Sequence, residues 1–264
     1  MDRGRMKTFV LCLLLAVNLT FLGLIIADRL QAARLESEAR EELVHVLYGL
    51  GISLSYDAIP NAGEQALYLL TRDIEAERQV AARVLQEPDE RDEGGGIYHY
   101  FSDIGTAQFR AGSFRFDFAD YAVSAGEGIP ETGFQMLRLL DLQVRRGVLQ
   151  GDELSYILTF EGLDVVGAAV HFTFSGGYLQ EITGPSLWGA SQRFSAGEQV
   201  DVATALMRLA GYLQGEGAAS RFAAVRMGYY LLEGPFYLAF RPVWIVETDT
   251  GVFSIDRQTG EIRS

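Results

Sequence analysis

The stretch FRPVWIVETDTGVFSIDRQTGEI, residues 240–262, decides how the end of the chain folds. It predicts two strands, Tyr237–Thr248 and Val252–Asp256, because both runs are rich in β-branched and aromatic residues. The tripeptide Asp249–Gly251 stands between them and is typical of a tight turn. Strands joined by so short a connection pair antiparallel, so this end of the chain predicts an antiparallel sheet.

A helix followed by strands recurs along the rest of the chain. Predicted helices begin near residues 73, 131 and 199, with Asp73 as the N-cap of the first. The strand groups that follow them are Ile97–Phe101, Thr106–Arg110 and Ser113–Phe118; Leu154–Phe160, Val165–Phe174 and Tyr178–Thr183; and Phe222–Leu232, Tyr237–Thr248 and Val252–Asp256. The pattern therefore predicts an α+β protein, built from repeated modules of a helix plus a three-stranded antiparallel sheet.

Two segments without clear periodicity separate these elements. Residues 87–96 (EPDERDEGGG) are acidic and glycine-rich and predict an exposed loop. Residues 121–130 (YAVSAGEGIP) have the weakest pattern, and we place the module boundary there. The expected organisation is a tail (1–7), an anchor (8–27), a juxtamembrane helix with a first α+β module (28–118), and C-terminal α+β modules (119–264).

The charge is placed unevenly along the 264 residues. The formal net charge is −13, and a 48% hydrophobic share excludes a disordered chain. The acidic balance also argues against nucleic-acid binding. Residues 1–7 carry +2 and residues 8–27 carry no charge, so residues 28–264 hold −15.

The neutral segment Thr8–Ala27 (TFVLCLLLAVNLTFLGLIIA) predicts a single transmembrane helix. Twenty helical residues span about 30 Å, the thickness of a bilayer's hydrocarbon core. The basic residues before it place the N-terminus in the cytoplasm and the rest of the chain outside, in a single-pass cell-membrane protein. A cleaved signal peptide is disfavoured by the length of the segment, and a lipoprotein signal by Leu11 before Cys12 within the apolar run. Candidate helix-pairing residues in the span are Asn18, Thr20 and Gly23.

Signatures of catalysis are missing from the sequence. The histidines His45, His99 and His171 lie far apart and no metal-ligand spacing joins them. No G-x-S-x-G motif occurs, and Lys7 is the only lysine, which excludes a Walker A motif from residues 28–264. Asp249 belongs to an Asp-Thr-Gly sequence like that of aspartic proteases, but a tight turn is the favoured interpretation. We therefore expect a non-enzyme without catalytic residues, cofactor or metal.

The end of the chain resembles the YycI/YycH family, membrane-anchored regulators of the Wal (Yyc) two-component system, and is closest to YycI. Two stretches carry the resemblance, RMGYYLLEG (226–234) and residues 240–262 quoted above. The family-like positions are Gly228, Tyr229, Pro242, Trp244, Asp249, Gly251, Asp256, Thr259, Gly260 and Glu261. The last of these also resemble the ending of PepSY-like domains, which implies modules of a PepSY- or cystatin-like kind.

The resemblance also implies a function and partners. It implies a non-catalytic extracytoplasmic regulator of a sensor histidine kinase that controls cell-wall metabolism. The expected partners are that kinase and a YycH-like protein in the membrane, contacted through the transmembrane helix and the outer domain, with no nucleic acid and no small-molecule substrate identified. The alternative is a PepSY-like extracellular module that binds or inhibits a protease.

Overall fold

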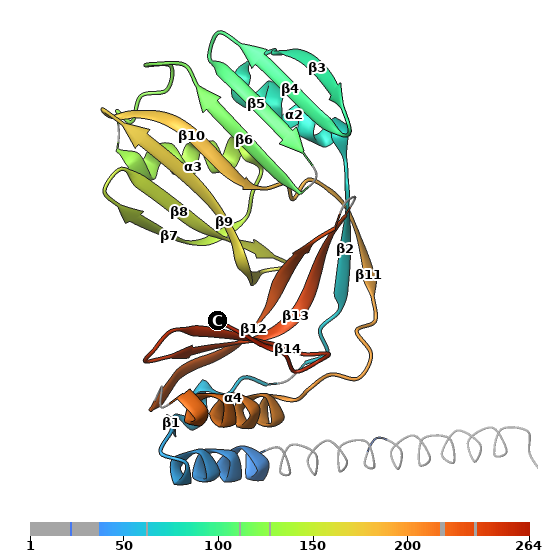
Figure 1. The fold of residues 1–264 in the computed structure, drawn as a ribbon, viewed down its shortest axis with the longest axis vertical. Helices are drawn as coiled ribbons and strands as arrows, with labels where there is room; N and C mark the ends of the chain where they lie inside the picture. Colours follow the sequence, from blue (N-terminus) through green and yellow to red (C-terminus); the bar gives the residue numbers. More distant parts are fainter. Residues whose placement is uncertain are drawn as a thin grey trace, which may run out of the picture.

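The computed structural model describes residues 22, 37–61, 63–110, 112–126, 128–216, 220–234 and 237–264. They form two lobes (Figure 1). We call residues 74–185 the inserted lobe, because they enter between two strands that pair with each other, β2 (Leu67–Arg72) and β11 (Gly189–Phe194). We call residues 37–72 and 189–264 the terminal lobe.

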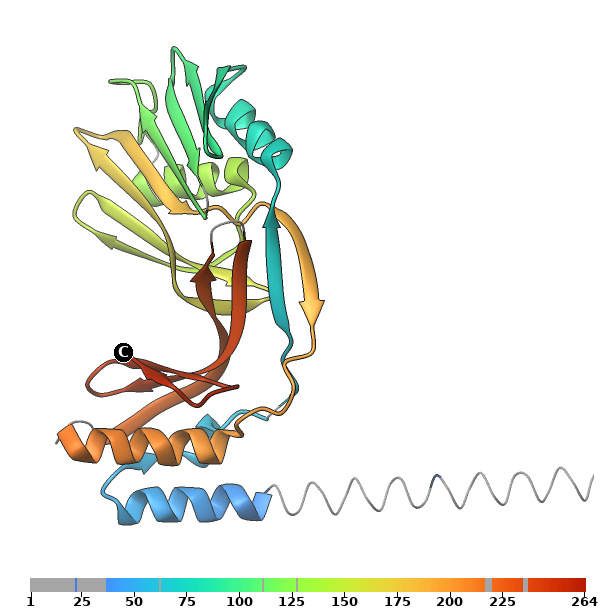
Figure 2. The ribbon, with the colours of Figure 1, turned by 45° about the vertical axis from the view of Figure 1, so that its right-hand side comes forward.

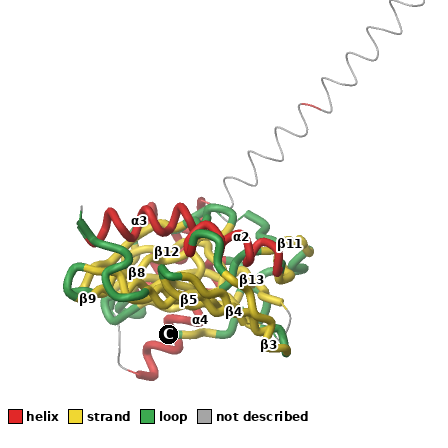
Figure 3. Tube along the Cα trace, turned by 90° about the horizontal axis from the view of Figure 1, so that it is seen from above, coloured by secondary structure: helices red, strands yellow, loops and turns green. Residues whose placement is uncertain are grey.

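The inserted lobe places two helices on one face of a sheet. Its elements are α2 (Ile74–Leu85), β3 (Asp89–Gly94), β4 (Ile97–Ser102), β5 (Gly105–Arg110), β6 (Ser113–Phe118), α3 (Ile129–Leu140), β7 (Val144–Gln150), β8 (Glu153–Phe160), β9 (Leu163–Ser175) and β10 (Tyr178–Pro185). Figure 3 shows α2 and α3 on the same side of these strands. In β6, the buried Phe114, Phe116 and Phe118 alternate with more exposed residues, which confirms the predicted half-buried strand.

The terminal lobe stacks helices beneath a second group of strands (Figure 2). Its elements are the helical residues 37–49, β1 (Ser53–Leu54), a 3-10 turn (Tyr56–Ala58), β2, β11, α4 (Val202–Glu216), β12 (Arg221–Glu233), β13 (Tyr237–Thr248), β14 (Val252–Asp256) and β15 (Ile262–Arg263). Leu47 of the first helix and Leu209 of α4 lie in one buried cluster with Trp244 of β13. This cluster is distinct from the core of the inserted lobe, which also takes in Leu70, Tyr229, Leu238 and Phe240 from strands of the terminal lobe.

All the strands in the described residues belong to one mixed, branched sheet of 15 strands. Its main path is β11-β2-β13-β12-β9-β10-β6-β5-β4-β3. β9 pairs antiparallel with β10 and β8 but parallel with β12, where Val165 lies opposite Tyr229. This parallel contact joins the strands of the two lobes.

The sheet overturns the predicted repeated modules of a helix plus three antiparallel strands. Strands of one predicted module pair with strands of another: β6 pairs with β10, and β13 pairs with β2. Short turns correctly indicated which strands are neighbours in hairpins, but they carry no information on pairings between distant segments. The pairing of β12 with β9 and of β2 with β11 and β13 is set by packing across the whole chain.

Two local predictions are also corrected. Residues 89–94 form the edge strand β3, not a loop, because they pair with β4, with Glu90 opposite Tyr100. The charged side chains that suggested a loop also suit a strand with an exposed edge. The sequence predicts the second helix over about Glu131–Arg146, but the helix α3 ends at Leu140, where Asp141 adopts a left-handed backbone with φ 55°. The strand β7 already begins at Val144.

The membrane prediction concerns residues that the structure does not describe. Asn18, Thr20, Gly23 and all of the segment 8–27 except Leu22 lie outside the described residues. Within the described ranges, no helix is both long enough and apolar enough to cross a bilayer. Residues 37–49 form a helix within the segment where the sequence predicts the juxtamembrane helix.

Candidate functional site

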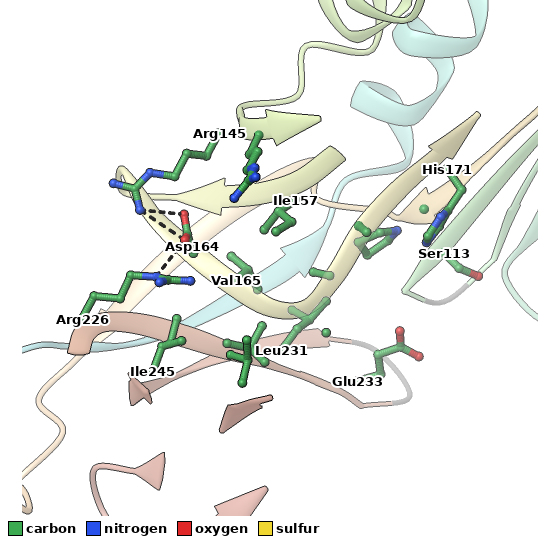
Figure 4. A pocket seen from close by; sticks show the side chains of 18 of the residues that line it. Ser113, Arg145, Ile157, Asp164, Val165, His171, Arg226, Leu231, Glu233 and Ile245 are labelled. Carbon is green, nitrogen blue, oxygen red and sulfur yellow. Dashed lines mark hydrogen bonds and ion pairs between the residues drawn. The ribbon is translucent and has the colours of Figure 1, made fainter. Parts of the chain in front are cut away.

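A cleft of about 760 Å³ lies at the junction of the two lobes. The lining residues come from β7, β8, β9, the start of β6 and the end of β10 in the inserted lobe, and from β12, β13 and the start of β14 in the terminal lobe (Figure 4). Three cross-strand neighbours on one face of β7, β8 and β9 line the cleft, namely Arg146, Ile157 and Ala169. The opposite face carries Tyr156 and Val170, which belong to the core of the inserted lobe. The cleft is thus bounded by the sheet face that the helices leave uncovered.

A bulge in β9 creates this junction. Residues 165–168 stand opposite the single residue Leu158 of β8, because Asp164 pairs with Thr159 and Ala169 with Ile157. The extra residues leave the ladder with β8, and two of them pair with β12 instead. Gly167 makes the bend possible, since its φ of +77° lies in the left-handed region that favours glycine.

A second bulge, in β7, turns two consecutive arginines toward the cleft. Val144 pairs with Leu158 and Arg146 with Ile157, so Arg145 is an additional residue between them. Consecutive residues of a regular strand point to opposite faces, whereas a bulge re-aims one side chain. Arg145 and Arg146 both line the cleft as a result.

Ion pairs link the lobes at one end of the cleft (Figure 4). The buried carboxylate of Asp164 lies 3.2 Å from Arg145 Nη1 and 3.2 Å from Arg226 Nε. Arg226 of β12 also pairs with Glu247 of β13. The Asp164 side chain has an exposed fraction of only 8%, and two guanidinium groups compensate its carboxylate. This arginine end of the cleft contains Arg145, Arg146 and Arg226 against Asp164 and Glu247, a net charge of +1.

Arg146 differs from its neighbour because it is not used in this network. It forms no ion pair with any residue in the described part of the chain, and its side chain is exposed in the cleft. Beside it, Ile157 leaves 39% of its surface exposed. The opposite end of the cleft carries Ser113, His171 and Glu233 (Figure 4). The cleft therefore offers an unpaired cation, exposed apolar surface and polar groups within one cavity.

One family-like position, Gly228 of β12, lies in close contact with residues that line the cleft. A Cβ atom there would overlap the Ile245 side chain and would lie 2.8 Å from the carbonyl oxygen of Asp164. Gly228 and Tyr229 pair with Val243 and Pro242 of β13, so the family-like Gly228, Tyr229 and Pro242 come together in one ladder. None of them lines the cleft itself, but Gly228 packs against Ile245 and Asp164, which do.

The remaining family-like residues make turns and core contacts. Asp256 Oδ1 accepts hydrogen bonds from Gln258 N (2.8 Å) and Thr259 N (3.0 Å), and Gly260 completes the turn at φ +73°, before Glu261. Trp244 packs in the terminal core under the guanidinium of Arg257, whose pKa is lowered by burial. These positions stabilise the fold, and the structure does not gather them around a cavity.

The Asp-Thr-Gly sequence is a turn, as predicted. The Asp249 carboxylate accepts hydrogen bonds from Ser220 N (3.1 Å), Ser220 Oγ (2.9 Å) and Arg221 N (3.4 Å). Hydrogen bonds from Ser220, first from its backbone and then from its side chain, hold the pKa of Asp249 below its usual range. Gly251 lies in the same turn, where its N–H donates to Thr248 Oγ1 at 3.1 Å. Asp249 is thus held by local structure.

The histidines remain apart in the structure. His99 Nε2 lies 2.6 Å from Gln108 Nε2 and 3.4 Å from Glu93 Oε2 in the sheet of the inserted lobe, whereas His171 lines the cleft. His45 lies on the helix of residues 37–49. Across the ranges that the structure describes, no three potential metal-ligating side chains form a group.

The residues of the cleft were not singled out by the sequence. Arg145, Asp164, Arg226 and Glu247 are spread over 100 positions, and no local motif joins them. The one signal was Gly167, a glycine inside a strand pattern, which is typical of a bulge or of close backbone contact.

The comparisons with known proteins found a structural likeness. No family model and no curated protein matches the chain. Among solved structures, it is similar to the Bacillus megaterium YpeB C-terminal domain, with 9% sequence identity and a TM-score of 0.39, over 74% of this chain and 98% of that one. This likeness gives no support to the YycI part of the resemblance. It carries no argument about function.

Proposed function

We propose that this chain is a non-catalytic regulator that binds another protein in the cleft between its two lobes. The observation that carries the proposal is the cleft itself. Its volume of about 760 Å³ lies within the usual range of ligand sites, about 300–1,000 Å³. Its buried carboxylate, Asp164, is compensated by two arginines and holds the lobes together, which suits a binding surface better than a catalytic centre.

The sequence directs this proposal to a membrane setting. The apolar segment 8–27 and the positive charges before it support a single-pass protein with an extracytoplasmic C-terminal domain. The resemblance of residues 226–262 supports a sensor histidine kinase of cell-wall control, with a YycH-like protein, as the partner. The helix of residues 37–49 packs on α4 of the terminal lobe, so the cleft and the predicted anchor are joined through one folded unit.

Site-specific photo-crosslinking of the full chain tests the proposal. The photoreactive residue p-benzoylphenylalanine replaces Ile157 in the cleft, and in a matched control it replaces Gln79, which is exposed on α2. Both proteins are expressed in the parent cells, irradiated, and purified from mild detergent. We expect a sensor histidine kinase to be crosslinked from position 157 and not from position 79.

Two results would contradict the proposal. The first is the same set of crosslinked proteins from both positions, which would remove the cleft as the binding site. The second is the absence of any kinase from the crosslinked material. Capture of a secreted peptidase at position 157 would instead favour the alternative, a protease-inhibiting module.

A further inference from the structure

We propose that the ligand of the cleft is an extended polypeptide segment with an acidic side chain, which adds to the free edge of β7 and places its carboxylate on Arg146. The inference rests on the proposed function, because it names the chemistry of the segment that the cleft receives. It depends on the edge of β7, the two bulges and the charge of the arginine end.

The edge of β7 is open to another strand. Among the described strands, β7 pairs only with β8, and six of its seven residues are exposed. An unpaired edge presents a row of backbone N–H and C=O groups, which an extended peptide satisfies by adding one more strand. β7 begins at the cleft, where Arg145 and Arg146 line the wall. A peptide that continues the sheet there would therefore enter the cleft.

The charge at the arginine end favours an acidic ligand there, because Glu233, which brings the whole cleft to neutrality, lies at the opposite end. Asp164 binds Arg145 and Arg226, and Glu247 binds Arg226, so these two carboxylates are already used. Arg146 remains the cation without an ion-pair partner among the described residues, in a region of net charge +1. The whole chain carries −13, so this local excess of positive charge is opposite in sign to the whole. A carboxylate completes the network by a charge-assisted hydrogen bond.

Apolar contacts complete the site. Ile157 is the cross-strand neighbour of Arg146 and leaves 39% of its surface exposed. On the other wall, Val252 leaves 51% of its surface exposed and Leu231 is partly exposed. A strand presents alternate side chains to one face. When an acidic residue of the peptide binds Arg146, the peptide residue two positions away therefore faces this apolar surface.

The test uses the full chain in detergent and an array of synthetic peptides. Each peptide is a labelled hexamer of alternating Val and Thr, in which one position in turn carries Glu, Gln or Lys. Fluorescence anisotropy measures binding. We expect at least one Glu peptide to bind about tenfold or more tightly than its Gln and Lys counterparts, as a hydrogen bond to a charged group predicts.

Variants assign the preference to Arg146. We expect Arg146→Gln to lose the difference between the Glu and Gln peptides, while Arg83→Gln, at an exposed arginine of α2, keeps it. Arg146 has no ion-pair partner among the described residues, so its substitution leaves the fold intact. Methylation of alternate backbone nitrogens in the best Glu peptide removes strand addition but keeps the carboxylate, and we expect it to abolish binding.

Three results would overturn the inference. They are equal binding of Glu and Gln peptides, equal effects of the Arg146 and Arg83 substitutions, and undiminished binding of the methylated peptide. Crosslinking of a kinase from position 157 together with any of these would leave the proposed function standing and reject only the acidic segment. Failure of that crosslinking, with the peptide results as expected, would reject the kinase and keep the acidic ligand.

Discussion

Arg226 Nε of β12 lies 3.2 Å from the buried Asp164 carboxylate of β9, and the pair ties the terminal lobe to the inserted lobe. The pair lies beside the parallel contact of β9 with β12, where Val165 faces Tyr229. An ion pair between side chains and the backbone pairing of two strands thus join the lobes at the same place. The geometry of the cleft depends on both.

Replacement of Asp164 by Asn is expected to destabilise the fold. It would leave Arg145 and Arg226 without their shared counter-charge, and we expect a loss of about 2–3 kcal/mol in the free energy of unfolding. The arginines reach solvent, which keeps the loss below that of a fully buried pair. Urea denaturation followed by tryptophan fluorescence measures it. The control is Glu247→Gln at the exposed end of the network, with a change within about 1 kcal/mol; equal losses in both variants would contradict the prediction.

Glu77→Gln tests a second buried charge, at the crossing between the lobes. Glu77 of α2 is fully buried; its Oε2 lies 2.6 Å from Arg72 Nη2, and its Oε1 accepts a hydrogen bond from Ser186 Oγ at 2.8 Å. Loss of the negative charge is expected to cost about 3 kcal/mol in a urea titration. Glu75→Gln, two residues earlier and exposed, should cost less than about 1 kcal/mol. A Glu77 variant as stable as the Glu75 variant would show that the contacts of Glu77 with Arg72 and Ser186 do not stabilise the connection between the lobes.

Two glycine substitutions are expected to have opposite effects on the melting temperature. Gly228→Ala forces a methyl group against Ile245 and the backbone of Asp164, and overpacking of this kind costs about 1–3 kcal/mol. Gly211→Ala meets open space on α4 and should stabilise the protein by about 0.5–1 kcal/mol, because alanine favours a helix. Thermal denaturation by circular dichroism compares them, and a shift of the same sign in both would count against the packing described for β12.

The contribution of Asp249 is expected to depend on pH. Its pKa is lowered in the folded protein by hydrogen bonds from Ser220 and Arg221, so its charged form stabilises the fold above the ordinary value of 3.8. That stability is lost as the pH falls through the lower, folded value. The urea midpoint of Asp249→Asn should therefore lie below that of the natural protein at pH 6, and the difference should narrow in strong acid. A gap that stays constant between the two conditions would exclude this charge effect.

Local sequence patterns predicted individual strands and turns well, but they did not predict which distant strands pair. The alternation of Phe114, Phe116 and Phe118 identified β6, and the Asp249–Gly251 turn was identified from three residues, since both depend on neighbours in the chain. The acidic residues 89–94 were misjudged because a charged edge strand and a charged loop have the same composition.

The cleft could not be predicted for a related reason. Arg145 lines it because of a bulge whose register depends on β8, and Asp164 meets Arg226 only after β9 leaves β8 for β12. The relevant residues belong to different strands, and the sequence records neither the register nor the partner of a strand. The repeated modules were wrong for the same reason, because they assumed that each strand pairs within its own segment.

The insertion between β2 and β11 has a consequence for how such a chain could arise. Asp73 N donates to Trp188 O at 3.4 Å, so the inserted lobe begins and ends at nearly one point. A segment whose two ends meet can be gained or lost in a single genetic event, because the strands on either side stay in register. Residues 74–185 supply one wall of the cleft, so their loss in such an event would also remove the cleft.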